Sequence, residues 1–82
     1  MILLAEAYIL MKVHVGSERD VFQKLKDIKE IVDINELYGE WDIIMKVRVA
    51  RIEDLDSLLT DKIRSIEEIK LTSTMIVAKY IH

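Results

Sequence analysis

Four stretches of the chain alternate hydrophobic and polar residues with a period of two, the pattern of strands that bury one face. They span residues 5–15, 31–38, 41–50 and 69–81. In the third stretch one row consists of Trp41, Ile43, Met45, Val47 and Val49, and the other row of Asp42, Ile44, Lys46 and Arg48. This alternation predicts four strands.

Two segments between these strands repeat their hydrophobic residues every three or four positions, as amphipathic helices do. They span residues 17–29 and about 53–65. Gly16 interrupts the first strand, and Ser17 with Asp20 forms a pattern that resembles a capping box. The apolar stripes are Val21, Leu25 and Ile28 in the first helix and Leu55, Leu58, Leu59, Ile63 and Ile66 in the second.

The order strand, helix, strand, strand, helix, strand is typical of the ferredoxin-like α+β fold, βαββαβ. In this fold two helices cover one face of an antiparallel four-stranded sheet, and the other face is open. The first strand carries apolar residues on both rows: Tyr8 and Leu10 on one, and Ala7, Ile9 and Met11 on the other. An open apolar face predicts a partner, so we expect two copies to pack sheet to sheet as a homodimer.

The composition indicates one globular domain over residues 1–82, because 51% of the residues are hydrophobic and disordered chains lack such content. A chain this short buries only part of its surface and needs further support. It has no cysteine for disulfides, and its two histidines are not spaced as metal ligands. We therefore expect no cofactor and no metal, and oligomerisation as the remaining source of stability.

The net charge of −3 argues against autonomous binding to nucleic acid, which depends on lysine and arginine at the phosphates. No apolar stretch is long enough for a membrane span, and Glu6 interrupts the apolar N-terminus. We expect a cytoplasmic protein with no membrane and no direct DNA contact.

Residues 38–42 read Tyr-Gly-Glu-Trp-Asp and lead directly into the alternating third strand. Gly39 beside a strand end is expected in a turn that requires a positive φ. This hairpin, together with the Thr-Ser-Thr run at residues 72–74, resembles the effector-binding domain of the Lrp/AsnC transcription regulators. Full members carry a helix-turn-helix module before this domain. This sequence begins almost at the first strand, so we expect a stand-alone domain without the DNA-reading module.

The resemblance implies dimers that assemble further, up to a ring of four dimers (an octamer), with amino acids or related metabolites bound between dimers near the hairpin. The residues it implicates in ligand binding are Tyr38, Gly39, Glu40, Trp41, Asp42, Thr72, Ser73 and Thr74. Asp42 either holds the hairpin through backbone hydrogen bonds or receives the ligand's ammonium group. Trp41 either lines the pocket or packs in the core or an interface, and the hydroxyls of residues 72–74 either contact ligand or belong to the sheet alone.

We interpret the chain as a sensor of amino acids or related metabolites that oligomerises and modulates full-length Lrp/AsnC regulators. Catalysis lacks support because there is no cysteine, His14 stands alone in its strand and the serines have no visible base. The acids Asp54, Asp56 and Asp61 fit a solvated helix face better than a metal site. The alternatives are a small dimeric ferredoxin-like enzyme of the monooxygenase type and a purely structural oligomerisation domain.

Overall fold

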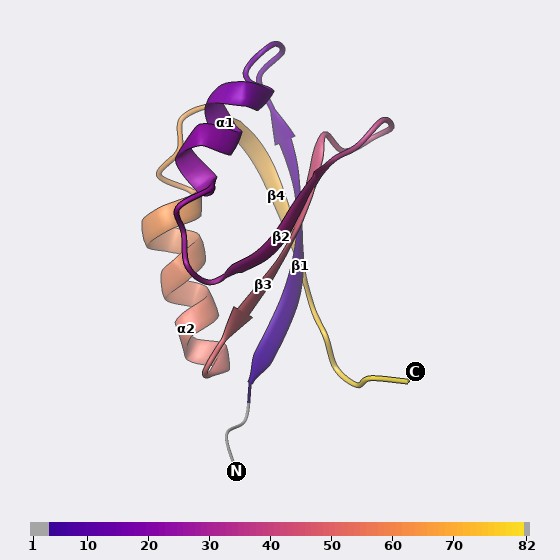
Figure 1. Ribbon diagram of the computed structural model, residues 1–82, viewed down its shortest axis with the longest axis vertical. Coiled ribbons are helices and arrows are strands. Elements are labelled where there is room, and N and C mark those ends of the chain that lie inside the picture. The colour runs from indigo at the N-terminus through magenta and orange to yellow at the C-terminus, as the bar shows by residue number, and fades with distance from the viewer. Residues whose placement is uncertain (1–3, 82) are drawn as a thin grey trace.

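A single antiparallel sheet with a helical layer on one face makes up the computed structural model, which describes residues 4–81 (Figure 1). The elements are β1 (Ala5–Val13), α1 (Glu18–Leu25), β2 (Ile31–Glu36), β3 (Ile43–Val49), α2 (Ile52–Ser57), the π-helix η1 (Leu58–Ile63) and β4 (Ile69–Ile76). The strands lie in the order β2-β3-β1-β4, and all three neighbouring pairs are antiparallel. The predicted ferredoxin-like α+β fold is confirmed.

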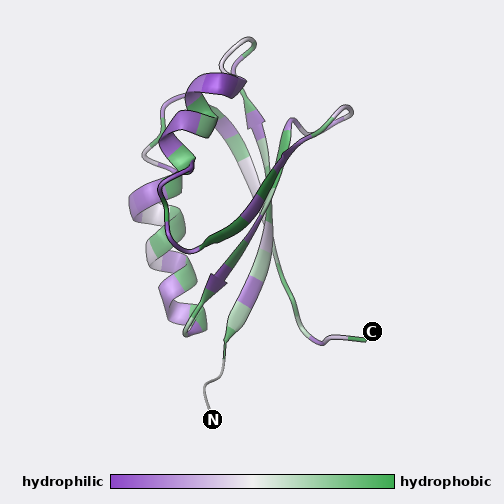
Figure 2. Cartoon of the chain, in the orientation of Figure 1, coloured by the Kyte–Doolittle hydropathy of each residue, from purple (hydrophilic) through white to green (hydrophobic). Residues whose placement is uncertain are grey.

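The core lies between the sheet and the helices, and one row of each central strand supplies it. Residues opposite one another in paired strands point to the same face, and Ile9 faces Met45 on one side and Thr74 on the other. The largest fully buried side chains are Ile9, Met11, Val21, Leu25, Ile43, Met45, Val47 and Ile63. The period-two row predicted in the third strand is therefore the core row from Ile43 to Val49. Hydrophobic and hydrophilic bands alternate along the helices that cover this row (Figure 2).

The first helix is shorter than predicted, because the backbone forms successive tight turns after Leu25 instead of further helical turns. The N–H of Ile28 donates to the Leu25 carbonyl at 3.0 Å, and the N–H of Ile31 donates to the Ile28 carbonyl at 3.2 Å. Ile28 still packs against the core, so the apolar period extends beyond the helix that it predicted. The capping box is wrong: the Ser17 hydroxyl donates to the His14 carbonyl at 2.5 Å and forms no cap bond.

The second helical segment changes its winding after Ser57. Its apolar stripe is buried as predicted, but α2 gives way to η1, where the N–H of Arg64 donates to the carbonyl of Leu59, five residues earlier, at 2.8 Å. Side-chain periodicity over one or two turns does not separate a period of 3.6 from the wider π-helix. None of the helices in the described residues is long and apolar enough to cross a membrane.

Each strand is shorter than its alternating stretch in the sequence, because backbone pairing ends first. The expected ends at residues 15, 38 and 81 become Val13, Glu36 and Ile76, and the third strand begins at Ile43 instead of Trp41. Beyond these points single backbone hydrogen bonds remain, such as those from the N–H of His14 to the Glu68 carbonyl and from the N–H of Val77 to the Glu6 carbonyl, but regular strand pairing does not continue. Alternation of side chains continues where the ladder of hydrogen bonds does not.

The sheet face opposite the helices is uncovered by any described residue and mixes apolar and charged side chains. Its exposed or half-buried apolar side chains are Tyr8, Leu10, Ile44, Leu71 and Met75. Glu6 also belongs to this face, yet it is only 5% exposed. Arg48 holds the Glu6 carboxylate with Nε at 2.7 Å and Nη2 at 2.6 Å, and Lys46 Nζ lies 3.8 Å away.

One ion pair joins α1 to the segment that enters β4. Lys24 Nζ donates to both carboxylate oxygens of Glu68, at 2.7 and 3.0 Å. This bond lowers the pKa of Glu68 and raises the pKa of Lys24. A lowered folded-state pKa means that ionised Glu68 stabilises the fold above its unfolded pKa of about 4.3, and that this contribution is lost as the pH falls through the folded value.

We expect Lys24→Gln to lower the melting temperature at pH 7, and the difference from the unmodified chain to shrink as the pH falls toward 3 and Glu68 takes up a proton. Thermal unfolding followed by circular dichroism across this pH range measures it. The control is Lys26→Gln, two residues away and exposed. A difference of equal size at pH 7 and pH 3 would contradict a role for the Glu68 charge.

Candidate functional site

The loop of the β2–β3 hairpin presents the predicted residues Tyr38, Gly39 and Glu40 to solvent. All three are exposed, and the N–H of Leu37 closes the loop by donating to the Asp42 carbonyl at 2.8 Å. Gly39 has φ +146°, which confirms the predicted positive φ. A Cβ at this position would meet nothing within 4 Å. Glycine is therefore required by the backbone conformation and not by a lack of space.

Asp42 ties the base of this hairpin to β1. Its Oδ2 accepts the N–H of Val13 at 2.9 Å, and its own N–H donates to the Met11 carbonyl at 3.0 Å. The side chain thus takes the place of a backbone acceptor where the β1–β3 ladder ends. Of the two roles left open for Asp42, the structure contains the backbone-holding one. No described residue donates a hydrogen bond to Oδ1.

Trp41 does not continue the core row of β3, which corrects the alternation read from the sequence. It lies before the first residue of the strand and is half-buried. The Nζ of Lys12 is 5.6 Å from the centroid of its ring, within cation–π range. Lys12 pairs with Leu71 on the row of β1 that faces away from the helices. Trp41 therefore contacts the open side of the sheet.

The Thr72-Ser73-Thr74 run of β4 is divided between the two faces of the sheet. Thr72 and Thr74 lie opposite Met11 and Ile9, on the helix side, whereas Ser73 lies opposite Leu10, on the open side. All three are half-buried. Thr72 lines a shallow hollow of about 390 Å³ together with Arg64, Ile69, Lys70 and Leu71.

The two halves of the predicted site lie on opposite sides of β1. Met11 is paired with Ile43, next to Asp42, on one side and with Thr72 on the other. Two strand spacings amount to about 10 Å, so the hairpin base and Thr72 share one level of the sheet but do not touch across β1. Within one copy the predicted residues do not converge on a common cavity.

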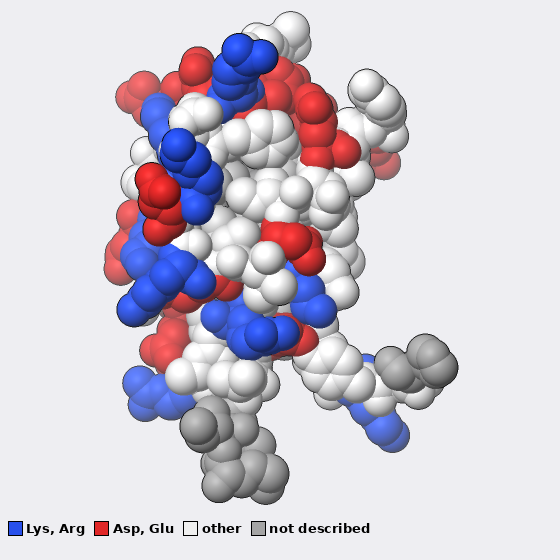
Figure 3. Space-filling view, viewed as in Figure 1, with Lys and Arg blue, Asp and Glu red and all other residues white. Residues whose placement is uncertain are grey.

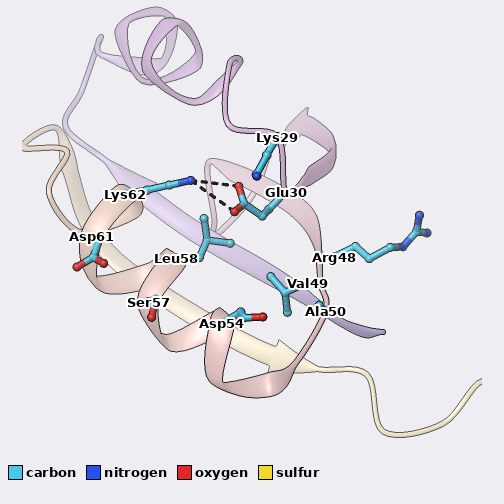
Figure 4. Close-up of a pocket in the computed structure, with 10 residues that line it drawn as sticks. All are labelled: Lys29, Glu30, Arg48, Val49, Ala50, Asp54, Ser57, Leu58, Asp61 and Lys62. Atoms are coloured by element: carbon cyan, nitrogen blue, oxygen red, sulfur yellow. Dashed lines mark hydrogen bonds and ion pairs between the residues drawn. The ribbon is translucent and has the colours of Figure 1, made fainter. Parts of the chain in front are cut away.

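A larger hollow, of about 420 Å³, lies between the end of β3 and the α2–η1 segment (Figure 4). It is lined by Lys29, Glu30, Arg48, Val49, Ala50, Asp54, Ser57, Leu58, Asp61 and Lys62. Sequence reasoning missed it because it assigned Asp54 and Asp61 to a solvated face. Asp61 is exposed, but Asp54 is half-buried at this hollow. The described residues include no cluster of three or more potential metal ligands.

Acidic and basic side chains are interleaved over the helical layer on the face shown in Figure 3, while uncharged side chains gather toward its middle. Three of the ion pairs are Lys24–Glu68, Lys62–Glu30 and Arg48–Glu6. Mutual neutralisation of this kind leaves this face without a continuous basic surface of the kind that phosphate backbones require.

Comparison with known proteins identifies relatives over nearly the whole chain. The family model described as the Lrp/AsnC ligand binding domain matches residues 6–81. The HTH-type transcriptional regulator FL11 of Pyrococcus furiosus is 41% identical over 73 residues, which are 89% of this chain and 48% of the regulator. The chain therefore spans about half the length of the curated relatives it matches.

Solved structures with the same fold include FFRP-DM1, which is 44% identical with a TM-score of 0.86, over 89% of this chain and 97% of that one. The transcriptional regulator NMB0573 of Neisseria meningitidis, solved as an L-Met complex, is 16% identical with a TM-score of 0.88, over 95% of this chain and 52% of that one. This second likeness concerns the fold alone.

The matched relatives are transcription regulators and not enzymes, so the monooxygenase-type alternative is set aside. The hairpin residues and the order of elements that suggested the family in the sequence lie within the matched range. The chain belongs to the family of Lrp/AsnC ligand-binding domains.

Proposed function

We propose that this chain is a stand-alone regulatory domain that binds an amino acid or a related metabolite in the cytoplasm. In this proposal it assembles into dimers and higher oligomers, and modulates full-length regulators of its family without binding DNA itself. The observation that carries the proposal is the ligand-binding-domain match over residues 6–81. A domain of the same fold occurs in the Neisseria regulator that was solved as an L-Met complex.

The proposed ligand site is shared between copies of the chain. The hairpin loop is exposed at Tyr38 and Glu40, and the groups nearest its base are on the open side of the sheet at Trp41 and Lys12. Because the predicted residues of one copy do not converge, a neighbouring copy has to supply the opposite wall. An octamer made of four dimers provides such junctions.

The open sheet face is the proposed dimer interface. Tyr8, Leu71 and Met75 are 37%, 52% and 47% exposed there. Apolar side chains on a strand face are stabilised when a second sheet excludes water from them. The ion pair of Glu6 with Arg48 is formed within one copy. The Glu6 carboxylate is therefore already paired when the face is buried in the interface.

Mixed assembly with full-length regulators follows from the same surface, because those regulators contain the same domain. The match covers 97% of FFRP-DM1, which is therefore a solved chain of similar extent and supports the stand-alone part of the proposal. A co-purification experiment tests mixed assembly directly. If a tagged full-length relative never retains this chain while each self-associates, the modulating role is wrong.

We expect one or a few of the twenty amino acids to raise the melting temperature of the purified protein. A ligand at one hundred times its Kd adds about 2.7 kcal/mol. In a domain of this size that amounts to roughly 10 to 20 °C. Differential scanning fluorimetry with light scattering on the same samples measures both properties. A stable oligomer that no amino acid stabilises would point to the purely structural oligomerisation domain.

We expect Asp42→Ala to destabilise the fold by about 1 to 3 kcal/mol, because the buried N–H of Val13 loses its acceptor. Asp42→Asn keeps an acceptor oxygen and should retain most of that stability. If Asp42 also receives a ligand's ammonium group, Asp42→Asn weakens ligand binding about tenfold, and Glu40→Gln in the same loop does not. Unaltered affinity in Asp42→Asn would leave Asp42 with the structural role alone.

We expect the double substitution Leu71→Asp and Met75→Asp to convert the oligomer into smaller species, because charges on the open face have to be desolvated in a sheet-to-sheet interface. Size-exclusion chromatography with light scattering measures the mass. Val15→Asp is the control, since Val15 is fully exposed in the β1–α1 loop and outside the sheet. An unchanged mass in the double variant would exclude the open face as the interface.

A further inference from the structure

We propose that the hollow beside α2 and η1 is a second small-molecule site, separate from the hairpin, and that it takes a small zwitterion with its two charges at opposite ends. We call it the helix-side pocket and define it by the ten residues drawn in Figure 4. This inference goes beyond the proposed sensing role of the hairpin, because the pocket is lined within one copy of the chain.

The pocket has the size and the apolar wall of a ligand site. Its volume of about 420 Å³ lies within the range of about 300 to 1,000 Å³ that is typical of small-molecule pockets. Leu58 projects into its middle from η1, and Val49 and Ala50 form the opposite side at the end of β3 (Figure 4). A short hydrocarbon body can pack between these two walls.

One end of the pocket carries a surplus positive charge. Lys62 Nζ lies 3.3 and 3.4 Å from the two carboxylate oxygens of Glu30, and Lys29 points toward the same carboxylate (Figure 4). Burial alone would raise the pKa of Glu30, but a backbone hydrogen bond and Lys62 together outweigh burial. The pKa of Glu30 is therefore lowered, and its carboxylate stays ionised at neutral pH. Glu30 balances one of the two lysines. Lys29 also helps to lower the pKa of Glu30 but forms no ion pair with any described residue, so two ammonium groups face one carboxylate and this end keeps a net positive charge.

The other end carries a carboxylate with a weak partner. Asp54 is half-buried, and its carboxylate is directed toward the end of β3 (Figure 4). Its ion pair with Arg51 is long, at 3.7 Å, and the Arg51 side chain is 73% exposed. Two further lining residues point away from the pocket in Figure 4: Asp61 toward solvent and Arg48 toward its partner Glu6.

This separation of charge selects a dipolar molecule. A simple anion would meet Asp54 and Glu30, and a simple cation would meet Lys29 and Lys62, so each pays a repulsion as well as a desolvation cost. A zwitterion places its carboxylate at Lys29 and its ammonium at Asp54, and both contacts are charge-assisted hydrogen bonds. Amino acids and ω-amino acids belong to this class.

The winding of η1 is an independent indication. Its first residue, Leu58, and Lys62, four residues later, both line the pocket. Short π-helical segments are rare and are frequent at functional sites. Here the π-helix forms one wall of the helix-side pocket and carries both an apolar and a charged lining residue.

The test is a titration of the full ¹⁵N-labelled chain followed by two-dimensional amide spectra. The probes are glycine, β-alanine, 4-aminobutanoate, 5-aminopentanoate and 6-aminohexanoate, with butanoate and butylamine as singly charged controls. We expect at least one zwitterion to shift the amides of Lys29, Ala50 and Leu58 in a saturable way, and both controls to leave them unchanged. If no zwitterion does so, or if a singly charged control does so equally, the proposal is overturned.

Matched variants test the two charges. We expect Lys29→Gln and Asp54→Asn each to weaken binding of the active zwitterion about tenfold, which corresponds to the loss of one charge-assisted contact. The controls are Lys26→Gln and Asp56→Asn, which remove exposed charges outside the pocket from the same regions of the chain. The amide spectrum of each variant also reports its folding. If Lys29→Gln and Asp54→Asn bind the zwitterion as tightly as the unmodified chain, the assignment is overturned.

The same spectra keep this inference apart from the hairpin proposal. Shifts confined to residues 38–42 would support the hairpin site and contradict the helix-side pocket. Shifts confined to the pocket would support the pocket even if Asp42→Asn had no effect on binding.

Discussion

The central position of β1 is the constraint on which the rest of this domain depends. The strand is hydrogen-bonded on both edges, to β3 and to β4, so its two faces are its remaining free surfaces. The helices cover the face of Ile9 and Met11, which are fully buried. The face of Tyr8 and Leu10 is uncovered within the described chain. The apolar side chains of that second face are the physical reason for expecting an oligomer.

Ion pairs decide how charge is arranged around this sheet. The buried carboxylate of Glu6 is held by Arg48, which keeps a charge from standing alone on the open face. On the helix side, Glu30 balances Lys62 and leaves Lys29 and Asp54 at opposite ends of one hollow. This local balance of charge underlies both proposals, the open face as an interface and the pocket as a site for a dipolar ligand.

The fold was predictable because it follows from periodicity, and periodicity is local. The row from Ile43 to Val49 and the stripe from Leu55 to Ile66 were recognised and are buried. The ends of elements were not predictable, because they depend on which residues find a backbone partner across the sheet. Trp41 fits the alternating row by position, yet it lies before the strand and contacts Lys12.

The sequence by itself determined the order of elements, the core rows, the requirement for glycine at Gly39 and the family, since each rests on residues close together in the chain. The tertiary structure alone decided that Asp42 accepts the N–H of Val13, 29 residues away, and that Thr72, and not Ser73, faces the helix side of the sheet. It also brought Lys29 and Asp54 to one pocket. These outcomes depend on register and on packing between distant segments, which no local pattern of residues encodes.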